Sequence, residues 1–309
     1  MHRTIEISLS SPHTDALLEQ LEREDDVIGL SVNRGASLKP RGDVVTAHVL
    51  NRSADRVFLA ARAAGDAGAE ISITTAELAA IVDPTHQDRV NGDVDEAQWE
   101  EMEAGLRHQG RITANFLVLM FCGGAVATVG LLENPVPQAI AFIACAMIAP
   151  GYEPLAKIPL GVVLRKWDLV KRGVQSALAG YLALFLGAAV MFAILRALNV
   201  ASLETLARNP EVKTLSHPDA FSLAFTVLGA FTGMIMIVAL RRSVIAGPLF
   251  LLATIPAAAL IGAAAVGGSW PLVKQGIERL AIDIAAIWAL GALVVAWKRA
   301  LVHKREPLA

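Results

Sequence analysis

The sequence contains little cysteine, and it has no recognisable metal or nucleotide motif. The two cysteines, Cys122 and Cys145, both fall in long apolar segments, so we predict no disulfide and give them a structural role there. The seven histidines show none of the close spacings that metal sites use, so we predict no metal site and no cofactor. A GxxxxGK[ST] loop is also missing, which argues against transport driven directly by ATP.

Charge and the N-terminal residues exclude two further classes. The formal net charge of -2 gives no reason to expect nucleic acid as a partner. The first residues lack a basic head followed by an apolar run, so no secretory signal is visible. We find no Ser/His, His/Glu or paired-Asp arrangement in the apolar segments that could carry out hydrolysis, and we therefore do not expect an enzyme.

The property that is present in excess is hydrophobicity. Hydrophobic residues make up 54% of the 309, the mean hydropathy is +0.51, and the apolar residues concentrate after Phe116. We therefore predict a cytoplasmic domain over residues 1–78 and a linker with a connector helix over 79–113. A transmembrane domain over 114–300 and a cytoplasmic tail over 301–309 are predicted to follow.

The N-terminal part alternates between patterns typical of strands and helices. RTIEISLS, VIGLSVNRG, DVVTAHVLN and AEISITT read as strands, and SPHTDALLEQLERED and SADRVFLAARAAGDAG read as helices. The order βαββαβ is that of a ferredoxin-like α+β sandwich, with both helices on one face of an antiparallel sheet. That fold hosts many functions, so it names no ligand, and we expect a regulatory role.

An amphipathic helix is predicted to connect the two parts. Within residues 94–113, Trp99, Met102 and Leu106 share one helical face. The helix could lie near the lipid headgroups, or it could act as a lever between the soluble domain and the membrane. The sequence leaves both readings open.

Six apolar segments are long enough to cross a bilayer. They cover about 114–132, 137–164, 174–198, 221–240, 244–266 and 277–297. Twelve Lys and Arg residues flank these spans on one side and four on the other, which places both termini in the cytoplasm by the positive-inside rule. We therefore expect a multi-pass protein of the cytoplasmic (inner) membrane, with the lipid bilayer as a partner.

The two halves of the predicted membrane domain resemble each other. KWDLVKRG, residues 166–173, follows the second span, and SWPLVKQG, residues 269–276, follows the fifth, with five of eight positions identical. Because each half has three spans, equivalent segments face opposite sides, with Trp167 inside and Trp270 outside. This arrangement predicts two inverted three-helix repeats, in which the substrate binds near the midplane at discontinuous helices.

The second span is predicted to be a broken helix. Pro150, Pro154 and Pro159 each remove a backbone donor, and freed carbonyls in hydrocarbon need protein or water as partners. Glu153 and Lys157 are four residues apart, which suits an ion pair on one face. Either the two charges neutralise each other, or Glu153 contacts a cation or proton during passage.

The second half offers a matching break and another carboxylate. Pro256 interrupts the fifth span beside Thr254, and Asp283 lies about two turns inside the sixth, where it could serve function or snorkel to water. Glu278 and Arg279 read as anchors at the external interface. The predicted substrate or ion pathway consists of Pro150, Gly151, Tyr152, Glu153, Pro154, Lys157, Thr254, Pro256 and Asp283.

These residues also resemble a known family. The pattern formed by Thr128, Gly130, Leu131, Leu132, Asn134, Pro135, residues 146–151, Pro154 and Leu155 is similar to that of the domain-of-unknown-function 389 family of bacterial and archaeal membrane proteins. The resemblance implies a multi-pass membrane protein with a cytoplasmic domain. The sequence departs from the family pattern at Ala149, at Tyr152-Glu153, at Ile255-Pro256 and at Asp283, so an ion preference does not transfer.

The sequence favours a membrane transport protein, either an ion channel or a secondary carrier for an inorganic ion or small solute. An ion is preferred because the candidate pathway offers carbonyls, hydroxyls and two carboxylates but few aromatics. The alternative is a membrane-anchored ligand sensor or assembly scaffold without transport.

Glycine-rich helix faces, including Gly123, Gly124, Gly229 and Gly233, suit close packing of helices. We also expect a homo-oligomer.

Overall fold

The protein is described by a computed structural model that covers residues 2–65, 70–94, 96–108, 110–239, 246–305 and 307, with only the backbone of 246–253. The chain divides into two compact units, Met1–Gln98 and Trp99–Ala309. The segment 79–113, predicted as linker and connector, is thus divided between the two units. Each unit is described by itself.

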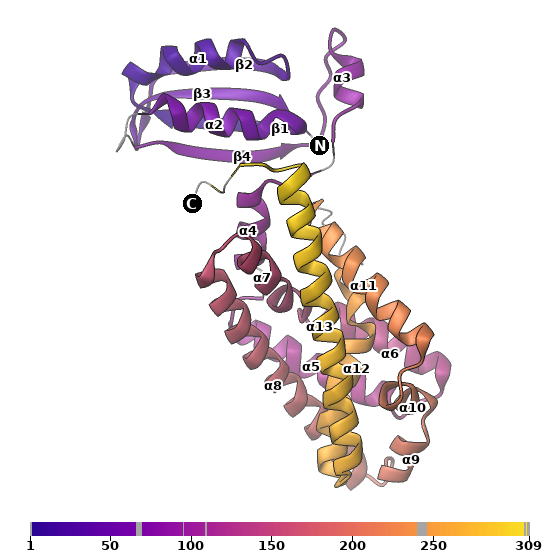
Figure 1. The fold of residues 1–309 in the computed structure, drawn as a ribbon. Coiled ribbons are helices and arrows are strands. Elements are labelled where there is room, and N and C mark those ends of the chain that lie inside the picture. Colours follow the sequence, from indigo (N-terminus) through magenta and orange to yellow (C-terminus); the bar gives the residue numbers. More distant parts are fainter. Residues whose placement is uncertain are drawn as a thin grey trace. The chain divides into compact units, whose positions relative to one another are not determined.

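The N-terminal unit is built around a four-stranded antiparallel sheet (Figure 1). The strands lie in the order β2-β3-β1-β4, and the predicted chain order βαββαβ is observed. The elements are β1 (His2–Leu9), α1 (Thr14–Glu22), β2 (Val27–Leu38), β3 (Arg41–Leu50), α2 (Ala54–Ala64), β4 (Ser72–Leu78) and the short α3 (Gln87–Asn91).

One face of the sheet forms the core of this unit. Successive side chains of a strand point to opposite faces, and alternate residues of β1 and β3 are accordingly fully buried. These are Ile5, Ile7, Leu9, Val45, Ala47 and Val49. The helices α1 and α2, which contact each other, bury Leu17, Leu21, Val57 and Phe58.

A cluster of charges around Asp26 joins separate parts of this unit. The Asp26 carboxylate, just before β2, accepts hydrogen bonds from Arg52 (3.1 Å), Arg56 (3.3 Å) and Arg89 (2.7 Å) and from the Ser53 hydroxyl. Burial by itself raises the pKa of Asp26, but the hydrogen bonds of Ser53, Arg52 and Arg89 and the charge of Arg52 outweigh it and lower that pKa to about 2. The ionised carboxylate therefore stabilises the folded unit.

We expect Asp26→Asn to destabilise this unit by about 1–3 kcal/mol at pH 7, because the arginines lose a charged acceptor. The folded pKa of Asp26 lies below its ordinary value of 3.8, so its contribution is present above about pH 4 and is lost as the pH falls toward 2. Hydrogen exchange of the β2 and β3 amides in the full chain measures this. The matched control is Asp25→Asn, because Asp25 is exposed. An equal loss of stability in Asp25→Asn would contradict the prediction. So would a stability difference between wild type and Asp26→Asn that persists to pH 2.

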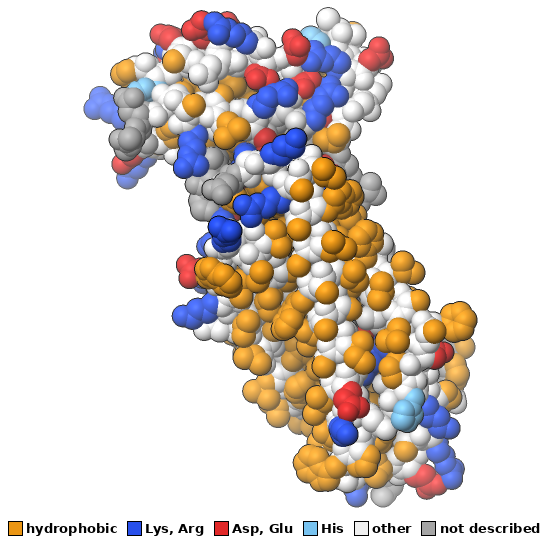
Figure 2. Space-filling model, in the orientation of Figure 1, with side chains coloured by type: hydrophobic (Ala, Val, Ile, Leu, Met, Phe, Trp, Pro, Cys, Tyr) orange, Lys and Arg blue, Asp and Glu red, His pale blue; other side chains and the backbone are white. Residues whose placement is uncertain are grey.

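The C-terminal unit consists of helices (Figure 1). Figure 2 shows hydrophobic side chains over most of its visible face, with charged side chains gathered toward its upper and lower ends. The helices are α4 (Trp99–His108), α5 (Ala114–Gly130), α6 (Pro135–Ile148), α7 (Tyr152–Val163), α8 (Trp167–Ala197), α9 (Leu203–Arg208), α10 (Pro210–Ser216), α11 (Ala220–Val238), α12 (Ala246–Gly267) and α13 (Trp270–Leu301). The helix α4 buries Trp99, Met102 and Leu106, as its predicted amphipathic face requires.

Three helices of this unit, α8, α11 and α13, are long and apolar enough to cross a membrane. The pair α6 and α7 passes the same test together, with a bend of 54°, and adds a fourth span if the two form one. The helix α5 and the described part of α12 are apolar but shorter. By length and composition, the described residues thus contain three or four candidate membrane spans, where the sequence predicts six.

Prolines interrupt the helices at one of the two predicted places. The chain leaves helical conformation between Ile148 and Tyr152, next to Pro150. Pro154 lies in the first turn of α7, where its missing N–H would have no helical partner in any case. Helix α12 continues through Pro256, so the break predicted there is wrong. A proline removes one hydrogen bond, and the surrounding residues of α12, which are fully buried, keep the helix intact.

The turns α7–α8 and α12–α13 are built in the same way. The Lys166 N–H donates to the Gly161 carbonyl at 2.8 Å in the first turn. The Ser269 N–H donates to the Ala264 carbonyl at 3.0 Å in the second. The residue before each donor has a positive φ, 57° at Arg165 and 82° at the glycine before Ser269. Both turns therefore end their helix with the Schellman pattern.

The helices that follow these turns also pack alike. A Cβ added at Gly173 would lie 3.0 Å from Ile158 Cγ1, and one added at Gly276 would lie 2.8 Å from Ile261 Cγ1. Glycine at both positions lets the second helix approach the first closely. In Figure 1, α8 runs down and α13 runs up the helical unit, so the two similar turns lie at its opposite ends.

The backbones of α5 and α8 approach each other closely at two glycines. A Cβ added at Gly124 would lie 2.1 Å from the Leu184 carbonyl oxygen, and one at Gly187 would lie 1.9 Å from the Phe121 carbonyl oxygen. Because both obstacles are backbone atoms, a side chain could fit only if the helices moved apart. Small residues at facing positions are typical of helix pairs in membranes.

We expect Gly187→Ala to lower the free energy of unfolding by about 1–3 kcal/mol, because the added methyl group overpacks the contact between α5 and α8. The matched control is Gly105→Ala in α4, where an added Cβ would meet nothing within 4 Å. That variant should be neutral or slightly stabilising. Thermal unfolding of the purified protein in detergent compares the two, and equal midpoints would contradict the predicted packing.

Candidate functional site

The break between α6 and α7 is held by buried tyrosines. Tyr152, the first residue of α7, is buried, and its hydroxyl donates to the Ala230 carbonyl of α11 at 3.4 Å. The Tyr181 hydroxyl of α8 donates to the Gly151 carbonyl at 3.5 Å. One carbonyl freed by the break therefore has a protein partner, as the apolar surroundings require.

Glu153 is the exceptional residue at this break. It lies in the first turn of α7, where the helix dipole favours a negative charge. Its Oε2 atom is buried and has no hydrogen-bond partner among the described residues. Polar atoms in such positions are nearly always paired with protein, water or an ion. Glu153 Oε2 can therefore accept a hydrogen bond, or bind a cation, from a partner that the described residues do not supply.

Lys157 does not form the predicted ion pair with Glu153. Its side chain is 2% exposed, and its Nζ donates to the Gly110 carbonyl at 2.9 Å. Gly110 lies in the segment before α5 and has a φ of 60°, a conformation that favours glycine. The i, i+4 spacing suited a pair on one helical face, but a carbonyl from a distant segment became the partner of Lys157.

A second polar group joins α11 and α13. The Thr226 hydroxyl donates to Asp283 Oδ1 at 3.0 Å, and Arg279 Nη2 lies 3.2 Å from the same oxygen. The Arg279 guanidinium also donates to Asp283 Oδ2 (3.3 Å), to Ser222 Oγ (2.8 Å) and to Thr226 Oγ1 (2.7 Å). Arg279 and Asp283 are each 1% exposed, so the ion pair is buried.

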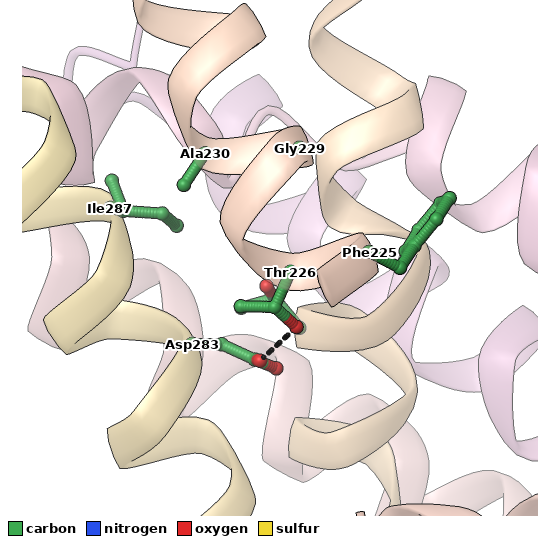
Figure 3. A pocket seen from close by; sticks show the side chains of 7 residues that line it. Phe225, Thr226, Gly229, Ala230, Asp283 and Ile287 are labelled. Atoms are coloured by element: carbon green, nitrogen blue, oxygen red, sulfur yellow. Dashed lines mark hydrogen bonds between the residues drawn. The ribbon is translucent and has the colours of Figure 1, made fainter. Parts of the chain in front are cut away.

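A small pocket lies beside this ion pair. In Figure 3, Thr226 and Asp283 point toward each other from α11 and α13, while Phe225 points away. The pocket is lined by Phe225, Thr226, Gly229, Ala230, Thr254, Asp283 and Ile287. Its free volume is about 10 Å³, which is roughly what one water molecule needs.

The structure brings some of the predicted site residues together. Thr254 and Asp283 line the same pocket, and Tyr152 is linked to it because its hydroxyl bonds to Ala230, another lining residue. Pro256 is buried in α12 but does not line the pocket. Pro150, Gly151, Glu153, Pro154 and Lys157 belong to the break and to the start of α7, outside the pocket lining.

Sequence reasoning missed Arg279, Ser222 and Thr226. Arg279 was predicted to anchor the protein at the membrane surface, and this is wrong because its side chain is buried and bonded to Asp283. The available signal was its i, i+4 spacing to Asp283. The same spacing occurs in the pair Lys274 and Glu278 on α13, which is exposed, so spacing alone does not separate the two cases.

Among the residues that the structure describes, no three His, Cys, Asp or Glu side chains group as a metal site would need. The long apolar helices suggest a helical membrane protein. Residues 146–289 match the family model described as "Domain of unknown function (DUF389)", which confirms the resemblance over that part of the chain. Comparisons with curated proteins and with solved structures gave no match.

We expect Asp283→Asn to destabilise the helical unit by about 3–5 kcal/mol, because it leaves the buried charge of Arg279 uncompensated. Arg279→Gln combined with Asp283→Asn should cost less than the sum of the two single variants. In the exposed pair, Lys274→Gln should change the stability by at most about 1 kcal/mol. Thermal unfolding in detergent measures these effects, and strictly additive costs for the buried pair would count against a coupled ion pair.

Proposed function

We propose that this protein is a membrane transport protein, a channel or secondary carrier for an inorganic ion or other small solute. The observation that carries the proposal is the carboxylate of Glu153, whose buried Oε2 lacks a partner among the described residues at a break between two apolar helices. An anchor in the membrane has no need of such a group. A pathway for cations or protons does need one.

The energetic reason concerns the charge of Glu153. An unpaired charge at the centre of a membrane helix costs about 3 kcal/mol on insertion scales. Lys157, four residues further along the same helix, donates to the Gly110 carbonyl and forms no ion pair with Glu153, so its charge offsets that of Glu153 only in part. Glu153 is therefore expected to take up a proton or a cation, and an exchangeable partner of this kind is what coupled transport uses.

Six spans remain our proposal for the membrane domain. The candidates are α5, the bent pair α6–α7, α8, α11, α12 and α13. With 17 residues, α5 lies at the lower end of the range of about 17–25 residues that spans a bilayer. The distribution of Lys and Arg supports cytoplasmic termini and, with them, a location in the cytoplasmic (inner) membrane.

The proposal that the two halves are inverted repeats has structural support. The turns α7–α8 and α12–α13 share their hydrogen-bond pattern, their glycine contacts and their WxLVKxG sequence motif. Because α8 and α13 run in opposite directions in Figure 1, equivalent segments would face opposite sides of a membrane. Transporters with inverted repeats bind substrate at the interface of the repeats. In this protein α11 contacts both candidate polar groups, because Ala230 accepts a hydrogen bond from Tyr152 and Thr226 donates one to Asp283.

The N-terminal unit is proposed to be a ferredoxin-like regulatory domain. Its strand order β2-β3-β1-β4 with antiparallel neighbours supports that fold, which does not identify a ligand. We also propose a homo-oligomer in the membrane.

The N-terminal unit has a hydrophobic core of its own, which favours the second candidate function, a ligand sensor or scaffold that would need no ion flux.

Ion flux into proteoliposomes containing the full chain tests the transport proposal, with Na⁺, K⁺, H⁺ and Cl⁻ gradients applied in turn. Glu153→Gln should reduce a selective cation or proton flux at least about tenfold, because the exchangeable charge is lost. Glu278→Gln is the control, since this carboxylate is exposed on α13. Wild-type vesicles that conduct none of the four ions would favour the sensor, and flux unchanged in Glu153→Gln would remove the site from the break.

A further inference from the structure

We infer that Arg279 is a built-in competitor for a monovalent cation: the pocket beside Asp283 binds one dehydrated monovalent metal cation when Arg279 releases the carboxylate. The inference rests on the proposed transport function for its purpose and adds a second ion site to it. The site is separate from Glu153, because its residues come from α11, α12 and α13.

The lining of the pocket offers the ligands that such a cation prefers. Asp283 supplies a carboxylate, and Thr226 and Thr254 supply hydroxyl oxygens from two other helices. Hard cations prefer oxygen ligands of these kinds. The helices hold these side chains on three sides of the same small space, which reduces the entropic cost of assembling a coordination shell.

Size and charge limit the occupant. The free volume of about 10 Å³ admits one water-sized species, as one water needs roughly 10–15 Å³. Organic cations are therefore excluded unless the helices separate. A divalent ion would meet one carboxylate and the positive charge of Arg279 close by, which leaves it undercompensated in apolar surroundings. A bare monovalent metal cation satisfies both limits.

Arg279 occupies the position of a counter-ion to Asp283, yet it has other partners. Its hydrogen bonds to Ser222 (2.8 Å) and Thr226 (2.7 Å) are shorter than those to the carboxylate, 3.2 and 3.3 Å. The guanidinium can therefore turn away from Asp283 and keep at least one hydroxyl. Burial raises the pKa of Glu211 in α10 and the charge of Arg279 opposes that rise, so a second carboxylate lies within electrostatic reach of Arg279.

Competition between two cations for one carboxylate has a measurable consequence. Arg279 and the metal cation cannot both be paired closely with Asp283, so each weakens the binding of the other. Removing the positive charge of Arg279 should strengthen binding of the metal cation. It should also leave a protein that is less stable without the cation and is rescued by it.

The experiment measures the thermal unfolding of the purified full chain in detergent as Na⁺ or K⁺ replaces choline at constant ionic strength. We expect Arg279→Gln to unfold earlier than wild type in choline and to be restored by Na⁺ or K⁺. The half-saturating cation concentration should be at least about tenfold lower than in wild type. Asp283→Asn should lose the specific response, and the exposed Lys274→Gln should behave as wild type.

Ser222→Ala keeps the inference testable if Arg279→Gln fails to fold. This variant removes the hydroxyl group of Ser222, which accepts a hydrogen bond from the Arg279 guanidinium. Arg279 then depends more on Asp283 as a partner and releases it less readily. The half-saturating cation concentration should then rise about two- to threefold, opposite to the effect of Arg279→Gln.

Two results would overturn the inference. One is a folded Arg279→Gln protein whose half-saturating cation concentration equals that of wild type, or whose stability choline restores as well as Na⁺ or K⁺ does. Either outcome would mean that the pocket holds water only. The other is a specific response that survives in Asp283→Asn. Failure of the transport proposal looks different, because the cation response at Asp283 would then persist while vesicles show no flux that depends on Glu153.

Discussion

The polar groups of the helical unit depend on one constraint, which is that a charged side chain among apolar helices must find its partner inside the protein. Asp283 and Arg279 meet it through each other and through hydroxyls of α11, so these contacts fix how α11 and α13 face each other. Lys157 meets it through the Gly110 carbonyl, which ties α7 to the segment before α5. Glu153 Oε2 is a buried carboxylate atom for which the described residues supply no hydrogen-bond partner, and the transport proposal rests on this atom.

The turns α7–α8 and α12–α13 are alike, but the helices around them differ in the residues that carry charge. Their turns and close glycine contacts are equivalent, because both arise from the same short motif and the same Schellman geometry. By the same offset that relates Gly173 to Gly276, Glu153 corresponds to Pro256 and Asp283 corresponds to Gly180. One half is broken and carries its carboxylate at the break, whereas the other is continuous and carries its carboxylate in the next helix. The two buried carboxylates therefore lie in different surroundings, one at a break and one within a continuous helix.

Sequence patterns predicted the elements whose signal is local. The alternation in β1 and β3, the apolar face of α4 and the break near Pro150 follow from neighbouring residues, and the structure contains all three. The partners of charged residues were harder to predict. Spacing paired Glu153 with Lys157, but the partner of Lys157 came from a residue far along the chain. Arg279 and Lys274 have the same i, i+4 spacing to a carboxylate, and only the packing of α11 against α13 decides which pair is buried. At Pro256 the packing of α12 prevailed over the local preference.

The segment that follows α13 contacts the connector helix α4. Beyond α13, Arg305 donates to both carboxylate oxygens of Glu100 in α4, at 2.7 and 2.6 Å, and His303 lies against the Trp99 ring with centroids 5.0 Å apart. A bidentate pair of this kind fixes orientation as well as distance. The connector helix α4 is thus bonded to the segment that directly follows α13, and its role as a lever stays a prediction.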